Sequence, residues 1–400
     1  MNRIAVLGEG VTGKAVRETL ARVDGYELVA LDQADLAVAS PGIPPKDYPE
    51  TTIPIISEIE FAYRLMHRPD SSYRPKLVGI TGTNGKSTVT ALLAHMMDIP
   101  ALGNFGTPLV TLVDSPTAPE WLVVELSSYQ LERCFDFRPD IAVILNLAPD
   151  HFSRHDSMLG YATEKAKIFQ SQLAEDVLFF NRDITLIRPL ADESKGQVVF
   201  FSDQDDFSSI DLPAKMVGGH NRVNVWIATQ LSERMGLPTA TAQSKLKTFR
   251  GLPHRIEWVA SVGGRSFFND SKSTNPDATE KAVSSFEENQ VHVIICGVDK
   301  GLDLVGLVDY LNDRVVSVTV FGDIAGRFMT TVKSQNVSVP VTEVLHLRDA
   351  LKAAYSASST GDVILFSPAC SSFDQFANFE SRGDQFRAVV RDLESSEVSV

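Results

Sequence analysis

The sequence predicts an α/β protein of three domains. We expect a small N-terminal Rossmann-like domain, a central domain of P-loop ATPase type with a mixed or parallel sheet, and a doubly wound C-terminal Rossmann-like domain. Strand-length apolar runs alternate with helical stretches, which is typical of βαβ units. A glycine-rich turn separates one such strand from a helix, and two Pro-containing breaks, at 68–75 and 251–255, divide the chain. The expected domains are residues 1–73, 74–252 and 253–400.

The composition is that of a globular protein with a large core. Of the 400 residues, 44% are hydrophobic and 22% are charged. The formal charge of −14 argues against a nucleic-acid or anionic-membrane surface, and the apolar runs are too short to span a bilayer. The three cysteines are far apart and show no disulfide or zinc spacing, which favours a reducing compartment. We therefore expect a cytoplasmic monomer without a nucleic-acid or membrane partner.

The first element is a strand over 3–7, followed by glycines at 8, 10 and 13. This pattern is similar to a dinucleotide-binding fingerprint, which is a weak signal when it occurs alone. The next clear strand, over 36–39, follows soon after, and no complete second βαβ half is evident. We therefore predict a short nucleotide-type domain and do not favour NAD binding.

The central domain opens with the stretch that organises the chain. An apolar strand over 76–80 leads into a glycine-rich turn, and a helix is expected over 89–97. Backbone N–H groups of such a turn bind phosphate, Lys86 adds a positive charge, and the Ser87 hydroxyl suits a phosphate-bound Mg²⁺. The glycine spacing differs from the strict phosphate-loop pattern, because position 80 is isoleucine.

Later central strands end on groups that could serve phosphoryl chemistry. The strand over 121–125 ends on Glu125, and the strand over 141–147 leads to His151. A helix expected over 161–173 carries Lys165, whose side chain could instead extend along the surface of the core. Further strands are expected over 177–180 and 198–201 and a helix over 221–235.

The C-terminal domain repeats this arrangement. Strands are expected over 266–270, 291–296, 315–321 and 363–366. The loops that follow them carry Asp270, Lys300 and a run of hydroxyl residues, while Arg255 lies just after the domain break. Carboxyl ends of parallel strands meet at one edge of a sheet, so these loops are expected to converge on one crevice.

Several motifs together resemble the Mur ligases and the folylpolyglutamate synthases. The phosphate loop over 81–88 carries the general resemblance, and the segments 125–132, 251–257, 269–275 and 367–383 narrow it to the Mur ligases. Within that family, the motifs are most similar to the branch that adds D-glutamate to UDP-N-acetylmuramoyl-L-alanine. The resemblance extends from about residue 1 to about residue 390.

The resemblance also implies roles for individual residues. It implies that ATP is bound by Gly82, Thr83, Asn84, Gly85, Lys86, Ser87, Thr88, Asn221, Asn224, Arg255 and Asp270. It implies two Mg²⁺ ions, held by Ser87, Glu125, His151 and a carbamylated Lys165, with Lys86, Glu125, His151 and Lys165 as the catalytic set. The UDP-sugar site would include Val11, Thr12, Ser40, Pro41 and Gly42, with Asn104 at the muramoyl-alanine part. D-Glutamate would be held by Thr274, Lys300, Ser372 and Phe379.

The implied activity is an ATP-dependent carbon–nitrogen ligation through an acyl phosphate. The resemblance places this step in peptidoglycan synthesis, and hence in cell-wall biogenesis, cell shape, cell division and the cell cycle. A sister ligase adding another amino acid, or glutamate to folate, is the nearest alternative, and a non-ligating nucleotide switch is a more distant one. Ser153 and Cys296 depart from the family motifs, and no acidic and basic pair for uracil follows the second strand.

Overall fold

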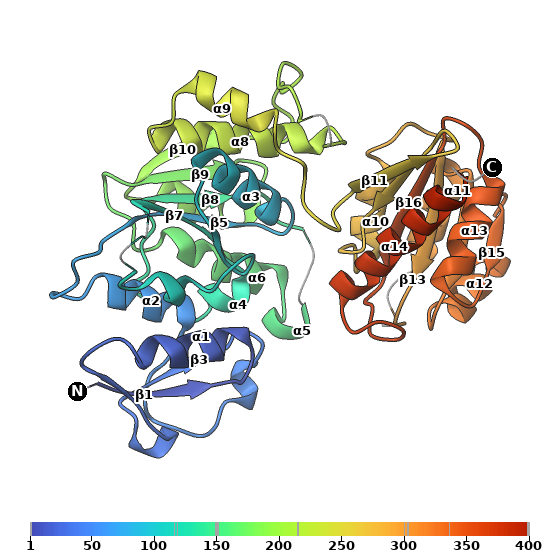
Figure 1. Ribbon diagram of the computed structural model, residues 1–400. Helices are drawn as coiled ribbons and strands as arrows, with labels where there is room; N and C mark the ends of the chain where they lie inside the picture. Colours follow the sequence, from blue (N-terminus) through green and yellow to red (C-terminus); the bar gives the residue numbers. More distant parts are fainter. Residues whose placement is uncertain are drawn as a thin grey trace. The chain divides into compact units, whose positions relative to one another are not determined.

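The computed structural model describes residues 2–115, 117, 119–148, 152–213, 216–299, 301, 304–335 and 337–397. It divides into two compact units, one of Met1–Ile210 with Val223–Leu246, the other of Asp211–Arg222 with Lys247–Val400. The first unit contains two sheets and the second contains one (Figure 1). The chain therefore has three sheets, in agreement with the predicted α/β fold. The proposed domain bounds stay a prediction. No helix in the described part of the chain is both long and apolar enough to cross a membrane.

The N-terminal sheet has four parallel strands in the order β2-β1-β3-β4. Its elements are β1 (Asn2–Leu7), α1 (Val11–Leu20), β2 (Tyr26–Leu28), η1 (Leu31–Gln33), β3 (Leu36–Ala39), η2 (Pro45–Asp47), β4 (Ile55–Ser57) and α2 (Glu58–Met66). The sequence did not predict β2 or β4, because a strand of three residues is too short to show a periodic pattern.

The central sheet has six parallel strands in the order β10-β9-β8-β5-β7-β6. The strands are β5 (Lys76–Thr81), β6 (Ala101–Gly103), β7 (Trp121–Glu125), β8 (Ile141–Ile144), β9 (Val177–Asn181) and β10 (Gln197–Phe201). The helices are α3 (Lys86–Met97), η3 (Leu109–Leu112), α4 (Ser128–Leu131), α5 (Phe152–His155), α6 (Met158–Ala166), η4 (Lys167–Phe169), η5 (Thr185–Ile187), α7 (Arg188–Asp192), α8 (His220–Arg234) and α9 (Thr239–Leu246). All four residues of β8 are buried, as expected of a central strand covered on both faces.

Three element bounds of this domain were predicted wrongly. Helix α3 begins at Lys86, not at residue 89, because Gly85 already adopts the left-handed conformation at the N-cap. Helix α6 ends at Ala166, and a separate 3₁₀ turn follows where the sequence predicted one helix up to residue 173. Strand β8 ends at Ile144 and not at residue 147.

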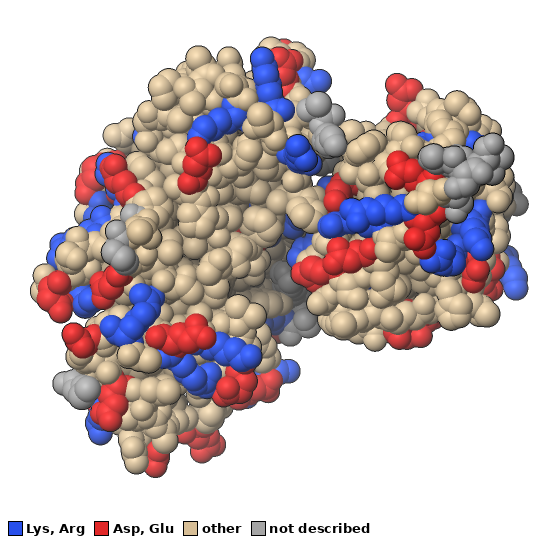
Figure 2. All heavy atoms as spheres, in the orientation of Figure 1, with Lys and Arg blue, Asp and Glu red and all other residues tan. Residues whose placement is uncertain are grey.

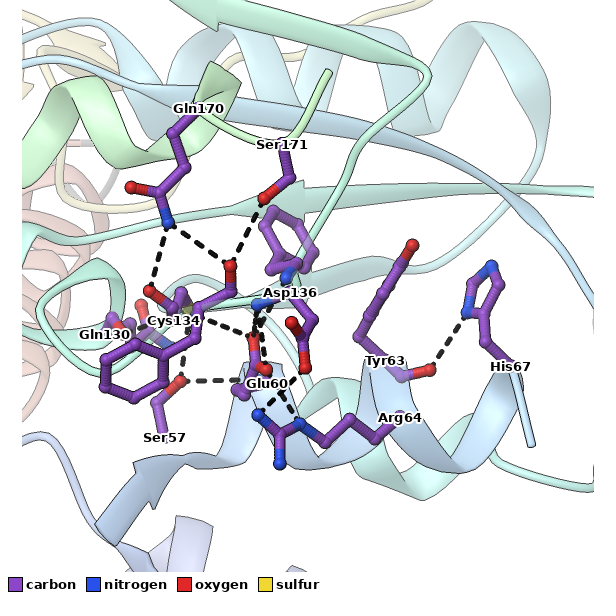
Figure 3. A network of polar contacts seen from close by, with 12 residues as sticks. Ser57, Glu60, Tyr63, Arg64, His67, Gln130, Cys134, Asp136, Gln170 and Ser171 are labelled. Atoms are coloured by element: carbon purple, nitrogen blue, oxygen red, sulfur yellow. Dashed lines mark hydrogen bonds and ion pairs between the residues drawn. The ribbon is translucent and has the colours of Figure 1, made fainter. Parts of the chain in front are cut away.

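A buried carboxylate joins the N-terminal domain to the central one (Figure 3). Glu60, on α2, is 0% exposed. Its carboxylate accepts the backbone N–H groups of Phe135 at 3.0 Å, Asp136 at 3.0 Å and Phe137 at 2.9 Å. Arg64 donates to the same carboxylate at 2.8 Å. One carboxylate therefore provides the hydrogen-bond acceptor for three consecutive backbone N–H groups in the loop between α4 and β8.

Two neighbours of Glu60 reinforce this connection. Glu58 is also buried and accepts the backbone N–H of Val110 at 2.6 Å. The Ser57 hydroxyl lies 3.2 Å from the Cys134 sulfur. The same stretch of chain thus bonds to two separate segments of the central domain, and the two sheets share one hydrophobic core.

The sheet of the second unit has the order β11-β12-β16-β13-β14-β15. Only β11 runs antiparallel to its neighbour. The elements are β11 (Glu257–Val262), β12 (Arg265–Asn269), α10 (Pro276–Val283), β13 (Val291–Cys296), α11 (Val305–Arg314), β14 (Ser317–Phe321), α12 (Ala325–Ser334), β15 (Val341–Glu343), α13 (Leu347–Ala357), β16 (Val363–Ala369) and α14 (Phe379–Glu397). Core side chains fill both faces of this sheet.

The thiols and the surface charges bear on function. The cysteines Cys134, Cys296 and Cys370 are free thiols and all three are buried. Lysine and arginine side chains are interspersed with aspartate and glutamate on the face drawn in Figure 2, where no broad basic patch forms. The predicted absence of a nucleic-acid partner and the cytoplasmic location remain predictions.

Candidate active site

The phosphate loop connects β5 to α3 and depends on its glycines. Gly85 has φ +83°, and a Cβ at this position would lie 2.7 Å from the amide oxygen of Asn224. Gly82 has φ +152°, and a Cβ there would lie 3.0 Å from Leu145. Any larger residue at position 85 would therefore combine backbone strain with a clash. The glycines let the loop backbone lie close to Leu145 and Asn224. They also put no side chain of their own at the N-terminus of α3, where a phosphate would bind.

Asn146, just after β8, holds this loop in shape. Its amide oxygen accepts the N–H of Asn84 at 2.8 Å, and its amide nitrogen donates to the Asn84 carbonyl at 3.1 Å. Its backbone carbonyl accepts the N–H of Thr83 at 3.0 Å. Asn146 was not among the predicted site residues, although its position as a polar residue directly after a buried strand was the available signal.

Two lysines lie at the loop. Lys86 donates to the carbonyls of Gly82 at 2.8 Å and Thr83 at 2.9 Å. Lys165, on α6, donates to the same Gly82 carbonyl at 2.9 Å and lies over the Tyr161 ring. Lys165 is 1% exposed. The alternative that it extends along the surface of the core is therefore wrong.

Glu125 presents an unpaired oxygen in the same region. It is 1% exposed, and Oε1 accepts the Asn104 amide at 2.7 Å. Oε2 is buried and has no hydrogen-bond partner among the described residues. A buried carboxylate oxygen without a partner costs free energy, so it fits a bound cation. Ser87, at the start of α3, is also buried and adds a hydroxyl.

These groups suit a hard divalent cation in chemical type. Carboxylate and hydroxyl oxygens are the ligands that Mg²⁺ takes in proteins, together with water and phosphate. Among the described residues, no three His, Cys, Asp or Glu side chains gather as a ready-made metal cage. The predicted ligand His151 lies outside the described residues.

The predicted UDP-sugar residues lie at the carboxyl ends of adjacent strands. Thr12 is in the first turn of α1, after β1, and Ser40 follows β3. The Ser40 hydroxyl is buried without a hydrogen-bond partner in the described structure. A Cβ on Gly8 would lie 2.5 Å from that hydroxyl, so the glycine is what makes room for it.

A side chain from the central domain supports this sugar loop. Arg154, on α5, donates to the Pro41 carbonyl at 3.1 Å and pairs with Glu132 at 2.7 Å. Its guanidinium also lies over the Tyr129 ring, 4.3 Å from the centroid. Sequence reasoning gave Arg154 no role, because its partner Pro41 is more than a hundred residues away.

In the second unit, Asp270 directly follows β12, and Arg255 lies just before β11. Asp270 is fully buried, and this desolvation raises the pKa of its carboxyl group to about 6. The carboxyl accepts the hydroxyls of Ser273 at 2.5 Å and Ser367 at 2.8 Å, and the backbone N–H of Ile256 at 3.1 Å. His254 and Ile256, which flank Arg255, both have positive φ, so the backbone at this arginine is held in a sparsely populated conformation.

The predicted D-glutamate residues come from neighbouring loops of the same unit. Thr274 follows β12, Ser372 follows β16 and is buried, and Phe379 begins α14. The Ser271 hydroxyl donates to the Phe379 carbonyl at 2.8 Å, which joins two of these loops. Lys300 lies outside the described residues.

The structure brings several predicted residues of the first unit to the phosphate loop. Lys86 and Lys165 bond to its Gly82 carbonyl, and the Asn224 amide oxygen lies against Gly85. Glu125 bonds to Asn104 and pairs with Ile80 near the end of the strand that leads into the loop. Asn221 belongs to the other unit and donates to the Val217 carbonyl at 2.7 Å. The roles assigned to all these residues remain predictions.

Comparisons of the sequence with family models and with known proteins all indicate the same family. Residues 80–235 match the Mur ligase middle domain, and residues 254–370 match the glutamate ligase domain of the Mur ligases. A protein of Geobacillus sp. named UDP-N-acetylmuramoylalanine--D-glutamate ligase is 36% identical over 399 residues, covering 92% of this chain and 86% of its own. A protein of the same name from Acidobacterium capsulatum is also 36% identical, with 92% and 84% covered.

A solved structure extends the likeness to the whole fold. The MurF ligase of Thermotoga maritima in complex with ADP aligns with a TM-score of 0.65 at 15% identity. The alignment covers 98% of this chain and 95% of that one. At this identity, the likeness concerns the fold alone.

Proposed function

Because the chain belongs to the family of UDP-N-acetylmuramoylalanine--D-glutamate ligases, we propose that it joins D-glutamate to UDP-N-acetylmuramoyl-L-alanine at the expense of ATP. The observation that carries this proposal is that Lys86 and Lys165 both bond to the Gly82 carbonyl of a phosphate loop. Glu125, which has a buried unpaired carboxylate oxygen, pairs with Ile80 near the end of the strand that leads into this loop. Such a loop with a cation site suits phosphoryl transfer. We assign the UDP-sugar to residues 1–73, ATP to 74–252 and the amino acid to 253–400.

The reaction has two steps. In the first, a carboxylate oxygen of UDP-N-acetylmuramoyl-L-alanine attacks the γ-phosphorus of ATP, and the bond to the bridging oxygen breaks to release ADP. In the second, the amine of D-glutamate attacks the acyl carbon of the resulting acyl phosphate, loses a proton, and expels inorganic phosphate. The first step converts a poor leaving group into a good one.

The chain contributes charge and orientation to the first step. The loop N–H groups and Lys86 bind the phosphates and offset the negative charge that develops during transfer. Asn146 fixes the loop, so these donors are in place before the substrate arrives. Asn104 orients Glu125 through its 2.7 Å hydrogen bond.

Mg²⁺ would be held by Ser87 and Glu125, and a second ion by His151 with Lys165. Bound there, Mg²⁺ supplies positive charge that neutralises the phosphate oxygens. An ammonium cannot ligate a cation, so Lys165 fits this role as a carbamate, which carries a negative charge on oxygen.

The amino acid would be held by Thr274, Lys300, Ser372 and Phe379. A cation and two hydroxyl groups suit the two carboxylates of glutamate. No acidic residue has been assigned to a second amine, which argues against a diamino acid. A site built around buried polar partners rejects analogues that leave those partners unpaired, often by about 10⁴-fold.

The direct test is amino-acid-dependent phosphate release from the full chain. With ATP, Mg²⁺ and UDP-N-acetylmuramoyl-L-alanine present, we expect D-glutamate to support turnover and L-glutamate and meso-diaminopimelate to fail. Replacement of the UDP-sugar by a folate is the control for the folylpolyglutamate-synthase alternative. Equal use of L-glutamate would overturn the substrate assignment, and phosphate release without any amino acid would favour the nucleotide-switch alternative.

A further inference from the structure

Arg382 is a fully buried cation in the first turn of α14. It is 0% exposed and is the largest side chain buried to this extent in the described structure. Burial lowers the pKa of its guanidinium, yet an arginine stays protonated in a protein. Among the described residues, no carboxylate pairs with it within 4 Å. A buried charge without an ion pair is costly, so its other contacts must hold it in place.

Those contacts are hydrogen bonds to two loops of the sheet. Nε donates to the Ser271 hydroxyl at 3.0 Å, and one terminal nitrogen donates to the Ser271 carbonyl at 2.8 Å. The other terminal nitrogen donates to the Cys370 carbonyl at 2.9 Å and lies 4.0 Å from the Cys296 sulfur. The planar guanidinium therefore joins groups from three different strand ends.

The three strands are neighbours in the sheet. Ser271 follows β12, Cys370 follows β16, and Cys296 ends β13, and the sheet order is β12-β16-β13. The backbone of Gly297 packs closely against the guanidinium, because a Cβ on Gly297 would lie 3.1 Å from one of its terminal nitrogens. Only a flat, forked donor can reach all of these acceptors, and lysine cannot reproduce that geometry.

The same loops carry the residues assigned to D-glutamate. Thr274 lies three residues beyond Ser271, and Ser372 lies two residues beyond Cys370. Phe379 is one turn before Arg382 on α14, and its carbonyl accepts the Ser271 hydroxyl. Every described residue assigned to the amino acid is thus within three positions of a residue bonded by Arg382, or of Arg382 itself.

We propose that Arg382 is a positioning residue for the amino-acid pocket, which fixes the loops after β12 and β16 at the spacing that D-glutamate requires. The proposal rests on the proposed function for the identity of the amino acid. It predicts a selective defect, because Asp270, assigned to ATP, is also held by Ser367 and Ile256, which lie outside the loop that Arg382 bonds. Loss of Arg382 should loosen the amino-acid loops while the ATP contacts persist.

The test compares Arg382→Lys and Arg382→Gln with the parent chain, and uses Arg391→Gln, an exposed arginine of the same helix, as the matched control. Steady-state KM values are measured for D-glutamate, ATP and the UDP-sugar, and ADP formation is measured in a single turnover without D-glutamate. We expect the D-glutamate KM to rise about tenfold in Arg382→Lys and about a hundredfold in Arg382→Gln, as lost charge-assisted hydrogen bonds predict. The other KM values and the single-turnover rate should change less than about threefold.

A second variant covers the case in which loss of the arginine unfolds the protein, which thermal unfolding would reveal. Ser271→Ala removes the hydroxyl that bonds to both Arg382 and Phe379 without burying a new charge. It should raise the D-glutamate KM alone. Unchanged D-glutamate KM in the folded variants, or an equal loss of single-turnover ADP formation, would overturn the positioning role. A parent chain that fails to use D-glutamate would instead overturn the proposed function.

Discussion

Lys86 and Lys165 both donate to the carbonyl oxygen of Gly82, at 2.8 Å and 2.9 Å, although 79 positions separate them in the chain. Two ammonium groups on one oxygen repel each other. Carbamylation of Lys165 would replace one of these positive charges with a negative one. Because only Lys165 would change the sign of its charge, we expect substitutions of the two lysines to have different effects.

We predict that Lys165→Ala is nearly inactive and that acetate or another short carboxylate partly restores turnover, whereas chloride does not. The reason is that, with the carbamate proposed above, the variant would lack an anionic oxygen ligand and not a cation. Turnover is measured with and without added carboxylate. Full activity in Lys165→Arg would show that a positive charge suffices and would exclude the carbamate.

Lys86→Ala should lose turnover by at least about 10²-fold, because it removes a preorganised charge from the phosphate loop. The measurement is phosphate release at saturating ATP. Lys46→Ala, an exposed lysine outside the loop, serves as the control. Near-parental turnover in Lys86→Ala would remove this lysine from the mechanism.

The stability of the chain should depend on the titration of Glu58. Burial raises the pKa of this carboxyl to about 7 from its ordinary 4.5. The folded state therefore holds a proton that the unfolded state has lost between these values, so the contribution of Glu58 to stability is fully present below pH 4.5 and is lost as the pH rises to 7. The loss attributable to Glu58 is about 3 kcal/mol.

Glu58→Gln stays neutral at every pH and should remove this dependence. We expect the variant to match the parent near pH 5 in urea unfolding and to be the more stable protein at pH 8. Glu50→Gln, an exposed substitution nearby, should leave the profile unchanged. Parallel pH profiles for Glu58→Gln and the parent would mean that Glu58 ionises normally.

Glu60→Ala should destabilise the first unit by about 1–3 kcal/mol. The substitution leaves three backbone N–H groups of the loop at 135–137 without their acceptor; the bond from Phe137 is buried and the other two are part-buried. A buried unpaired donor costs about 1 kcal/mol or more, and a part-buried one costs less because water can reach it. Urea unfolding measures the loss, with Glu50→Ala as the exposed control. A loss below about 1 kcal/mol would show that water replaces the carboxylate at this turn.

Much of the fold could be predicted from the sequence, because several of its strands are buried along their whole length. Strands such as β8 and β13 therefore appear as continuous apolar runs. The glycine-rich turn likewise marks the start of α3. The strands β2, β4, β6 and β15 are three residues long and give no such signal.

The candidate site was predictable only where a short motif carries it. The phosphate loop and Glu125 occur in local patterns, and the structure brings Lys165 to the loop. Contacts between distant segments leave no trace in one sequence. Arg154 bonds to Pro41 across 113 positions, and Arg382 bonds to Ser271 across 111.

The three buried cysteines have a practical consequence. Desolvation raises the pKa of the Cys296 thiol to about 12 and of Cys370 to about 11, and it raises that of Cys134 still further. Thiolate is the form that reacts with maleimides, so the native thiols are poor targets. A single cysteine introduced on the surface of each unit can therefore carry a fluorophore or spin label without first removing the natural ones. Distances between such labels, measured with and without nucleotide, would show whether the separation of the two units depends on the nucleotide.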